Sequence, residues 1–201
     1  MTGYLEELAV EAEAVGAVPG APSWDDDGWE AKLAGLLADP PPAVSFTFGC
    51  PPLAELVRRV VEATDVPVAA AGGIVTAGDV QADLGAGAVA AQCGTAFLRC
   101  PESGAHLRHK AALADPSSTG TAFTRAFSGR WARGIENDFM RRHPDAPAAY
   151  PEVNNATRPI RAAAAAGGDA GRMSLWAGTG FRAATDRPAG EVVEVLCGPG
   201  A

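Results

Sequence analysis

The sequence predicts an α/β fold with parallel strands, and three observations support this prediction. Short apolar runs, typical of buried strands, alternate with segments of helical periodicity. The connections between them are short, which favours parallel βαβ units. With 201 residues, 47% of them hydrophobic, the chain is long enough for one sizeable core. No internal repeat or clear linker divides it, so we expect a single domain over residues 1–201.

The first 50 residues contain two predicted helices and one predicted strand. Residues 4–16 place apolar side chains on one stripe and acidic side chains opposite, which predicts a helix. Residues 29–37 have the same amphipathic pattern, and proline-rich runs precede and follow them. Residues 43–48 are apolar and β-prone, so we expect a buried strand there.

The central part of the chain contains the clearest strand–helix–strand unit. Residues 53–63 have helical spacing of leucine and valine, and residues 66–71 form the buried strand that follows. Residues 76–84 are predicted to be helical, and residues 88–92 form the next buried strand. Two parallel strands with a crossover helix are therefore expected here.

The character of the sequence changes after Pro101. Polar and glycine-rich residues dominate up to Gly134, and residues 144–159 are loop-like because of their proline and asparagine content. Four short helices are expected in this part, at residues 106–113, 139–143, 161–166 and 191–196.

Composition limits the classes of function. The net charge is −8 and the sequence pI is about 4.8, which argues against binding to nucleic acid or to anionic lipid. The N-terminal residues lack the pattern of a signal peptide, and no apolar run is long enough to span a membrane. The four cysteines are widely spaced, so a reduced cytoplasmic setting with thiols acting as small apolar groups is expected. They are Cys50, Cys93, Cys100 and Cys197.

Two successive predicted strands each end in a glycine-bearing turn. The turns are Ala71-Gly72-Gly73-Ile74 and Gln92-Cys93-Gly94-Thr95. Glycine lets backbone N–H groups approach a phosphate closely, and the N-terminus of a following helix favours its charge. Thr95 adds a hydroxyl donor. A glycine pair after a strand is often only a tight turn, but two such turns on neighbouring strands favour phosphate binding.

These turns and their surroundings resemble the nitronate monooxygenase family, also called the 2-nitropropane dioxygenase family. The most specific stretch is residues 72–103, which contains both turns and the Leu-Gly-Ala-Gly-Ala run at 84–88. Similar segments occur on both sides of this stretch, at residues 25–29, 44–49, 66–71, 124–130, 132–135 and 176–178. The resemblance therefore covers nearly all of the chain.

The resemblance implies a partial TIM-type β/α barrel that holds non-covalent FMN and oxidises small alkyl nitronates with O2. Residues 66–103 would be its phosphate-binding core, and residues 104–201 its C-terminal loops and helices. In the family the two turns hold the FMN phosphate. By position the cofactor-binding residues are Gly73, Gln92, Cys93, Gly94 and Thr95, with Gly72 added from the turn alone. A cytoplasmic enzyme is expected, and assembly into a homo-oligomer is compatible with the sequence.

The sequence departs from the family pattern at three points. The family's first strand and its flavin-ring contacts are expected before Tyr4. The Gln-Gly-x-Glu-Ala-Gly-Gly-His segment, which carries the family's catalytic histidine as a general base, has no counterpart between Pro52 and Leu53. Thr179 stands where the family usually has glutamine after Trp-Ala-Gly. The catalytic residue is therefore unassigned, and a catalytically inactive remnant that binds flavin or phosphate is the alternative function.

The three histidines and an acidic run have ordinary structural interpretations. His106 and His109 are expected to be exposed on one helix face, and His143 to end a helix. Their spacing supports no metal site. Residues 25–27, three aspartates, are expected to be a solvated capping cluster rather than a cation site.

Tryptophans and arginines in the second half allow two interpretations each. Trp131 and Trp176 could line a pocket, although burial in the core is the commoner fate of tryptophan. Arg125, Arg130 and Arg133 could face a phosphate, although surface ion pairs are commoner. Another phosphate-binding barrel, such as an isomerase or an IMP dehydrogenase-like enzyme, is the weakest alternative. An IMP dehydrogenase needs a catalytic cysteine loop, and Cys93 and Cys100 do not lie in one.

Overall fold

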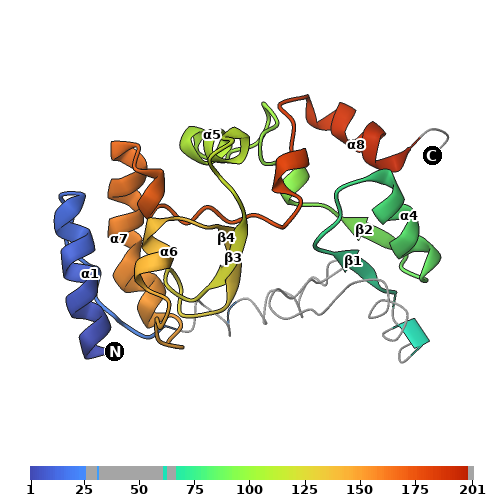
Figure 1. Cartoon of the computed structure of the whole chain (residues 1–201). Coiled ribbons are helices and arrows are strands. Elements are labelled where there is room, and N and C mark those ends of the chain that lie inside the picture. The colour runs from blue at the N-terminus through green and yellow to red at the C-terminus, as the bar shows by residue number, and fades with distance from the viewer. Residues whose placement is uncertain (26–30, 32–60, 63–66, 199–201) are drawn as a thin grey trace. The chain divides into compact units, whose positions relative to one another are not determined.

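The fold comes from a computed structural model, which describes residues 1–25, 31, 61–62 and 67–198 (Figure 1). The chain divides into two compact units. Unit 1 consists of Met1–Gly49, Phe123–Ala132 and Asn137–Ser174, and unit 2 of Cys50–Ala122, Arg133–Glu136 and Leu175–Ala201. The single domain expected from the sequence stays a prediction. The predicted strand 43–48, and nearly all of the predicted helices 29–37 and 53–63, lie outside the described residues.

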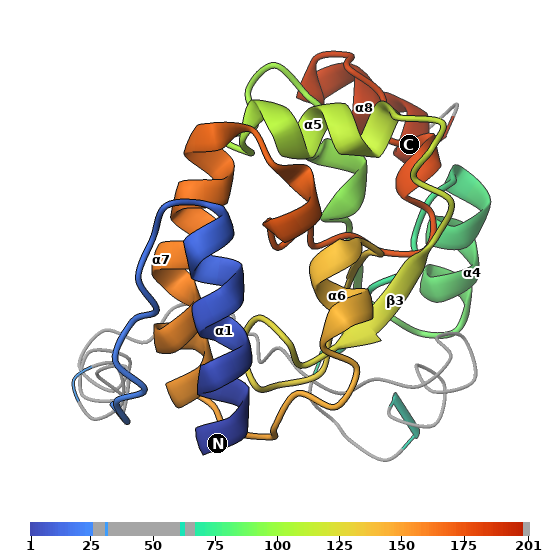
Figure 2. The same ribbon diagram turned by 60° about the vertical axis from the view of Figure 1, so that its left-hand side comes forward.

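Unit 1 contains three α-helices among its described residues: α1 (Thr2–Ala14), α6 (Asp138–Arg142) and α7 (Glu152–Gly167). The first two confirm the helices predicted at 4–16 and 139–143. Helices α1 and α7 lie side by side (Figure 2). A stacked pair, Phe127 and Phe139, with ring centroids 4.7 Å apart, lies in the core together with the fully buried Leu8 of α1.

Helix α7 corrects the prediction of a loop over 144–159, because the helix already begins at Glu152. Pro159 lies inside it and cannot donate a hydrogen bond to the carbonyl of Asn155. That carbonyl faces Gly20 instead: a Cβ at Gly20 would lie 2.1 Å from it. The expected end is confirmed, since Gly168 caps the helix in the left-handed region at φ 75°.

Unit 2 contains a short parallel sheet. Strand β1 (Ala69–Ala71) pairs in parallel with β2 (Ala90–Gln92), and helix α4 (Ala77–Gly85) connects them. This is the predicted strand–helix–strand unit, but both strands are shorter than expected. They are also less buried than expected, since only Ala70 among their residues is buried. The α/β class with parallel strands is therefore confirmed.

Two further α-helices of unit 2 match the sequence predictions. Helix α5 (Leu107–Ala114) matches the helix predicted at 106–113, and α8 (Ala189–Cys197) contains the one predicted at 191–196. Helix α8 packs against α4. The described residues also form three short 3-10 helices: η1 (Thr95–Phe97), η2 (Ala170–Arg172, in unit 1) and η3 (Phe181–Ala183).

A second two-stranded sheet was missed by the sequence analysis. It consists of β3 (Thr121–Thr124) and β4 (Ala132–Ile135), in a stretch that we expected to lack strands. Gly134 of β4 forms an antiparallel bridge with Trp176. A Cβ at Gly134 would lie 2.9 Å from the carbonyl oxygen of Leu175, so glycine permits this close approach of two backbones.

Candidate functional site

The two glycine-bearing turns lie next to each other in the structure. Strands β1 and β2 are parallel, and Ala71 is opposite Gln92 in their register. Because the turns begin at these two residues, both leave the sheet at the carboxyl ends of its strands. The carboxyl ends of parallel strands are the usual place for ligand sites in α/β folds.

Glycine is required in the first turn by its backbone conformation. Gly72 has φ 100° and Gly73 has φ 72°, which side chains other than glycine rarely adopt. Both residues are exposed. A Cβ at Gly72, or at Gly94 in the second turn, would have no heavy atom within 4 Å. The two turns therefore border open space rather than packed side chains.

Several backbone N–H groups of the turns are open to a ligand. Among the described residues, no hydrogen-bond acceptor takes the N–H of Gly73, Gly94 or Thr95. Buried N–H groups are almost always paired within a protein, whereas exposed ones bind water or a ligand. Gly73 and Gly94 are exposed, so the turns present hydrogen-bond donors that suit an anion.

The N-terminus of helix α4 is occupied by the chain's own carboxylate. Asp79 Oδ2 accepts hydrogen bonds from the N–H groups of Val75 (2.9 Å) and Thr76 (2.8 Å). These bonds hold the pKa of Asp79 below its usual value, so the carboxylate is charged at neutral pH. We expected this helix end to contribute to phosphate binding, and that expectation stays a prediction. Asp79 takes the N–H groups of Val75 and Thr76, whereas no described residue accepts from those of Ala77 and Gly78. The signal was present in the sequence as a capping box, Thr76-x-x-Asp79.

A hydrogen bond joins the second turn to the segment that contains Trp176. The N–H of Gly178 donates to Thr95 Oγ1 over 2.9 Å. The N–H of Ala177 donates to the carbonyl of Arg133 in β4 over 3.2 Å. Trp176 is half-buried. The segment therefore links β4 to the turn that follows β2.

The expected exposure of the histidines needs one correction. His106 is exposed and caps α5, as its Nδ1 accepts from the N–H of Arg108, and His143 ends α6 as expected. His109, however, is half-buried, and its Nε2 atom is buried with no partner among the described residues. Burial lowers the pKa of His109, which makes the imidazole neutral at pH 7.

The arginines and Trp131 also differ from expectation. Trp131 is 54% exposed, so its predicted place in the core is wrong. The guanidinium of Arg125 lies over the Trp131 ring at 4.6 Å from its centroid, and that of Arg130 over the Tyr150 ring at 4.5 Å. Arg133 donates to Thr121 Oγ1 over 3.0 Å. Arg125 and Arg130 thus form cation–π pairs within unit 1, whereas the glycine turns belong to unit 2.

Two of the cysteines behave as small apolar residues. Cys93 is half-buried against a core cluster that contains the buried Cys100. Burial raises the pKa of both thiols, so they are neutral at pH 7. Cys197 is exposed, which differs from the expectation, and Cys50 lies outside the described residues.

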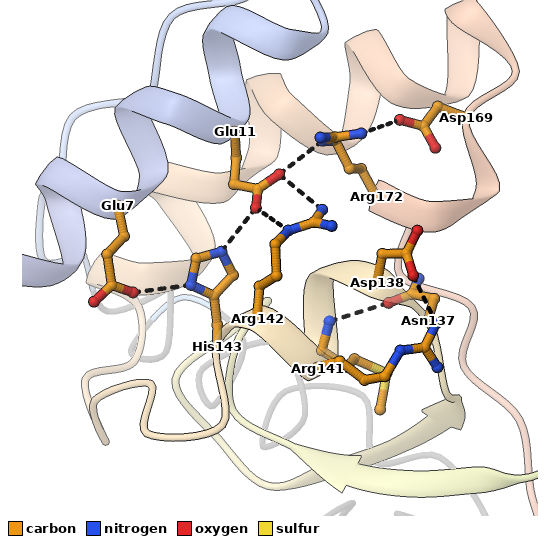
Figure 3. Close-up of polar contacts among 10 residues, drawn as sticks. Glu7, Glu11, Asn137, Asp138, Arg141, Arg142, His143, Asp169 and Arg172 are labelled. Atoms are coloured by element: carbon orange, nitrogen blue, oxygen red, sulfur yellow. Dashed lines mark hydrogen bonds and ion pairs between the residues drawn. The ribbon is translucent and has the colours of Figure 1, made fainter.

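The densest cluster of charged side chains lies elsewhere, in unit 1, and the sequence analysis missed it (Figure 3). Glu11 of α1 is 4% exposed and accepts hydrogen bonds from Arg142 Nε (2.6 Å) and Arg172 Nε (2.7 Å). His143 lies between two carboxylates, with Nε2 at 3.2 Å from Glu11 and Nδ1 at 2.9 Å from Glu7. Burial would raise the pKa of Glu11, but the two arginines outweigh burial and lower it.

This cluster has a structural role, because it joins α1 to other residues of unit 1. Its members contact one another across short distances between α1 and the segment that contains α6 and η2. Asp169 adds a further ion pair to Arg172 at 2.7 Å. Sequence spacing could not reveal the cluster, because Glu11 and its partners are more than 130 residues apart.

The described part of the chain contains neither a metal cluster nor a membrane span. Within residues 1–25, 31, 61–62 and 67–198, no three side chains of His, Cys, Asp or Glu are arranged to hold a metal ion. Over the same residues, no helix has the length and apolar composition needed to cross a bilayer.

Comparison with protein families gives a match over most of the chain. The family model described as nitronate monooxygenase matches residues 52–198. The nitronate monooxygenase of Pseudomonas aeruginosa is 41% identical over 145 residues, which are 70% of this chain and 41% of that protein. The probable nitronate monooxygenase of Bacillus subtilis is 39% identical over 137 residues, 67% of this chain and 40% of that protein. The chain thus spans about two fifths of the length of these curated relatives.

Two solved structures are similar to this chain. A nitroalkane oxidase from Streptomyces ansochromogenes matches with a TM-score of 0.90 and 41% identity, over 97% of this chain and 74% of that chain. FabK from Thermotoga maritima matches with a TM-score of 0.62 and 27% identity, over 74% of this chain and 49% of that chain.

Proposed function

Because the chain belongs to the nitronate monooxygenase family, a family of oxidoreductases, we propose that its paired glycine turns bind the phosphate of FMN. The proposed reaction is the oxidation of small alkyl nitronates with O2. The open backbone N–H groups of Gly73, Gly94 and Thr95, at the same edge of the β1–β2 sheet, carry this proposal.

The residues of the two turns fit a phosphate dianion. Each open N–H can donate one hydrogen bond, and hydrogen bonds to a charged acceptor are roughly twice as strong as neutral ones. The positive φ angles of Gly72 and Gly73 and the open space beside Gly72 and Gly94 leave room for phosphate oxygens. We include Gln92 and Cys93 in the site because they complete the second turn. The carboxylate of Asp79 accepts from the N–H groups of Val75 and Thr76, directly before its helix.

When bound, the flavin would supply the redox chemistry between the nitronate and O2. The task of this chain is to hold the cofactor's phosphate and so to fix where the ring lies. We propose that β1 and β2 are neighbouring strands of a partial TIM-type barrel, in which such turns line the ligand-binding rim. A cytoplasmic location and a homo-oligomer stay predictions from the sequence.

A second candidate function is an inactive remnant that binds flavin or phosphate without turnover. One observation favours it: the sequence contains no Gln-Gly-x-Glu-Ala-Gly-Gly-His segment, so no residue takes the place of the family's catalytic histidine. His106 and His143 each serve as helix caps, and His109 is half-buried on α5.

Flavin binding and oxygen uptake separate the two candidates. The purified 201-residue chain is incubated with FMN, dialysed, and examined for a flavin absorption spectrum, with riboflavin as the phosphate-free control. Bound FMN together with oxygen uptake on propyl nitronate supports the enzyme. Bound FMN without oxygen uptake supports the remnant. Failure to retain FMN in preference to riboflavin contradicts both.

A further inference from the structure

The hydroxyl group of Thr95 donates no hydrogen bond to any described residue. A threonine hydroxyl offers one O–H donor and two acceptor lone pairs. The N–H of Gly178 takes one lone pair over 2.9 Å. No acceptor among the described residues takes the O–H of Thr95. The hydroxyl is thus fixed as an acceptor toward Gly178 and keeps its proton for another partner.

The segment that carries Gly178 is itself held in place. The N–H of Ile135 in β4 donates to the carbonyl of Leu175 over 2.8 Å, and the N–H of Ala177 donates back to Arg133 over 3.2 Å. Gly134 and Trp176 form the bridge between these two bonds. The N–H of Gly178 therefore comes from backbone that β4 orders, and it can orient the hydroxyl that it contacts.

We propose that the N–H of Gly178 positions the Thr95 hydroxyl as a donor to the phosphate, so that the Trp176–Gly178 segment controls how strongly the chain prefers FMN to riboflavin. This inference rests on the proposed function. Gly178 is a positioning residue here, because it acts through Thr95. Accepting one hydrogen bond polarises a hydroxyl and strengthens the bond that it donates, so the two bonds reinforce each other.

The geometry of the contact between Gly178 and Thr95 allows each disruptive variant to be paired with a conservative control. A Cβ at Gly178 would lie 3.4 Å from Thr95 Oγ1, an ordinary van der Waals distance, so Gly178→Ala keeps both the N–H and the contact. Gly178→Pro removes the N–H. Thr95→Val removes the hydroxyl at similar size, and Thr95→Ser keeps it.

The test measures the ratio of FMN affinity to riboflavin affinity in the full chain. A purely structural defect weakens both ligands alike, whereas loss of a phosphate contact changes the ratio. We expect Thr95→Val and Gly178→Pro each to lower the ratio about five- to tenfold. Gly178→Ala and Thr95→Ser should stay within about twofold of the wild type. In the double variant Thr95→Val/Gly178→Pro the affinity ratio should fall no further than in the more affected single variant. Both changes remove the same hydrogen-bonded arrangement, from Gly178 through Thr95 to the phosphate.

Three outcomes overturn the inference. If Gly178→Pro leaves the ratio unchanged while Thr95→Val lowers it, Thr95 acts alone. If the two losses multiply in the double variant, the residues are independent. If the wild type does not prefer FMN, the proposed function fails as well, which distinguishes that failure from the first two.

Hydrogen exchange of the Gly178 amide gives a second readout that does not depend on the proline variant folding. The exchange should be slow in the wild type and in Thr95→Ser, and faster in Thr95→Val. FMN, but not riboflavin, should slow it further in the wild type. Equal exchange rates in the wild type and in Thr95→Val would overturn the inference.

Discussion

Units 1 and 2 both contain polar groups that could be assigned to a ligand, and they differ in how these groups are partnered. In unit 1 the charged side chains around Glu11 bond to one another, and Glu11 itself is nearly inaccessible to water. In unit 2 the residues Gly73 and Gly94 are exposed, and no described residue accepts from their N–H groups.

This difference separates a structural cluster in unit 1 from a candidate binding site in unit 2. A cluster of charges attracts attention, but one whose members satisfy one another offers little to a ligand, and removing one member leaves a buried charge without its partner. Open backbone donors at the end of a parallel sheet carry no side-chain signature beyond glycine, yet they are the groups that a phosphate requires. We therefore expect substitutions in unit 1 to change stability and substitutions in the turns to change binding.

Truncation of the core of unit 1 should have the largest effect. Leu8 of α1 is fully buried, whereas Val10 of the same helix is 68% exposed. We expect Leu8→Ala to lower the free energy of unfolding by about 2–5 kcal/mol, because it leaves a cavity. The matched control Val10→Ala should change it by less than about 0.5 kcal/mol. Urea denaturation measures both, and equal effects would show that α1 does not pack as described.

Removal of the buried carboxylate should be nearly as costly. We expect Glu11→Gln to lower the free energy of unfolding by about 2–4 kcal/mol, since Arg142, Arg172 and His143 lose their shared partner. The exposed Glu13 of α1 provides the control, Glu13→Gln. The folded-state pKa of Glu11 is lowered, so its contribution should be complete above the usual pKa of 4.5 and disappear as pH falls through the folded-state value. A difference between wild type and Glu11→Gln that does not shrink at acidic pH would contradict this.

Gly94 should show the opposite pattern, with binding changed and stability retained. Its φ is −110°, which other residues adopt readily, and a Cβ there meets no heavy atom within 4 Å. We expect Gly94→Val to weaken FMN binding at least about tenfold, or about 1.4 kcal/mol, because the side chain fills the space beside the N–H donors. Gly104→Val, at another exposed glycine with open space, is the control. Titration of flavin fluorescence measures the affinity, and an unchanged affinity would mean that the phosphate lies elsewhere.

The cap of α4 should give the smallest effect. Asp79→Ala removes the carboxylate from the N–H groups of Val75 and Thr76, and we expect a loss of at most about 1 kcal/mol in the free energy of unfolding. This contribution should be present above the usual pKa of 3.8 and lost as pH falls below it, because the folded-state pKa is lowered. FMN affinity should not fall. Gln81→Ala on the exposed face of α4 serves as the control. A large loss of FMN affinity in Asp79→Ala alone would place the carboxylate in the binding site.

Local patterns made the β1–α4–β2 unit predictable from the sequence. Apolar runs gave its strands, and Thr76 marked the start of its helix. The glycine turns and the Gly168 helix stop depend on backbone conformations that few residues adopt, so they too were visible. The parallel pairing that brings the turns together followed from the short connections.

Long-range packing explains what the sequence analysis missed. The first half of α7 looked like a loop because of its asparagine and proline, yet Val153, Ala156 and Ile160 recur at helical spacing and are fully buried. Tertiary burial outweighed weak local propensity there. Strands β3 and β4 are four residues each and show no alternation of polar and apolar residues. The Thr95–Gly178 bond joins residues 83 positions apart and has no local signal.

The binding of the FMN phosphate at the paired turns can be tested on individual backbone amides. In ¹⁵N–¹H NMR spectra of the full chain, FMN should shift the amide resonances of Gly73, Gly94 and Thr95, whereas riboflavin should leave them nearly unchanged. Binding of FMN with no change at these three amides, or equal changes with riboflavin, would contradict the assignment of the phosphate to the paired turns.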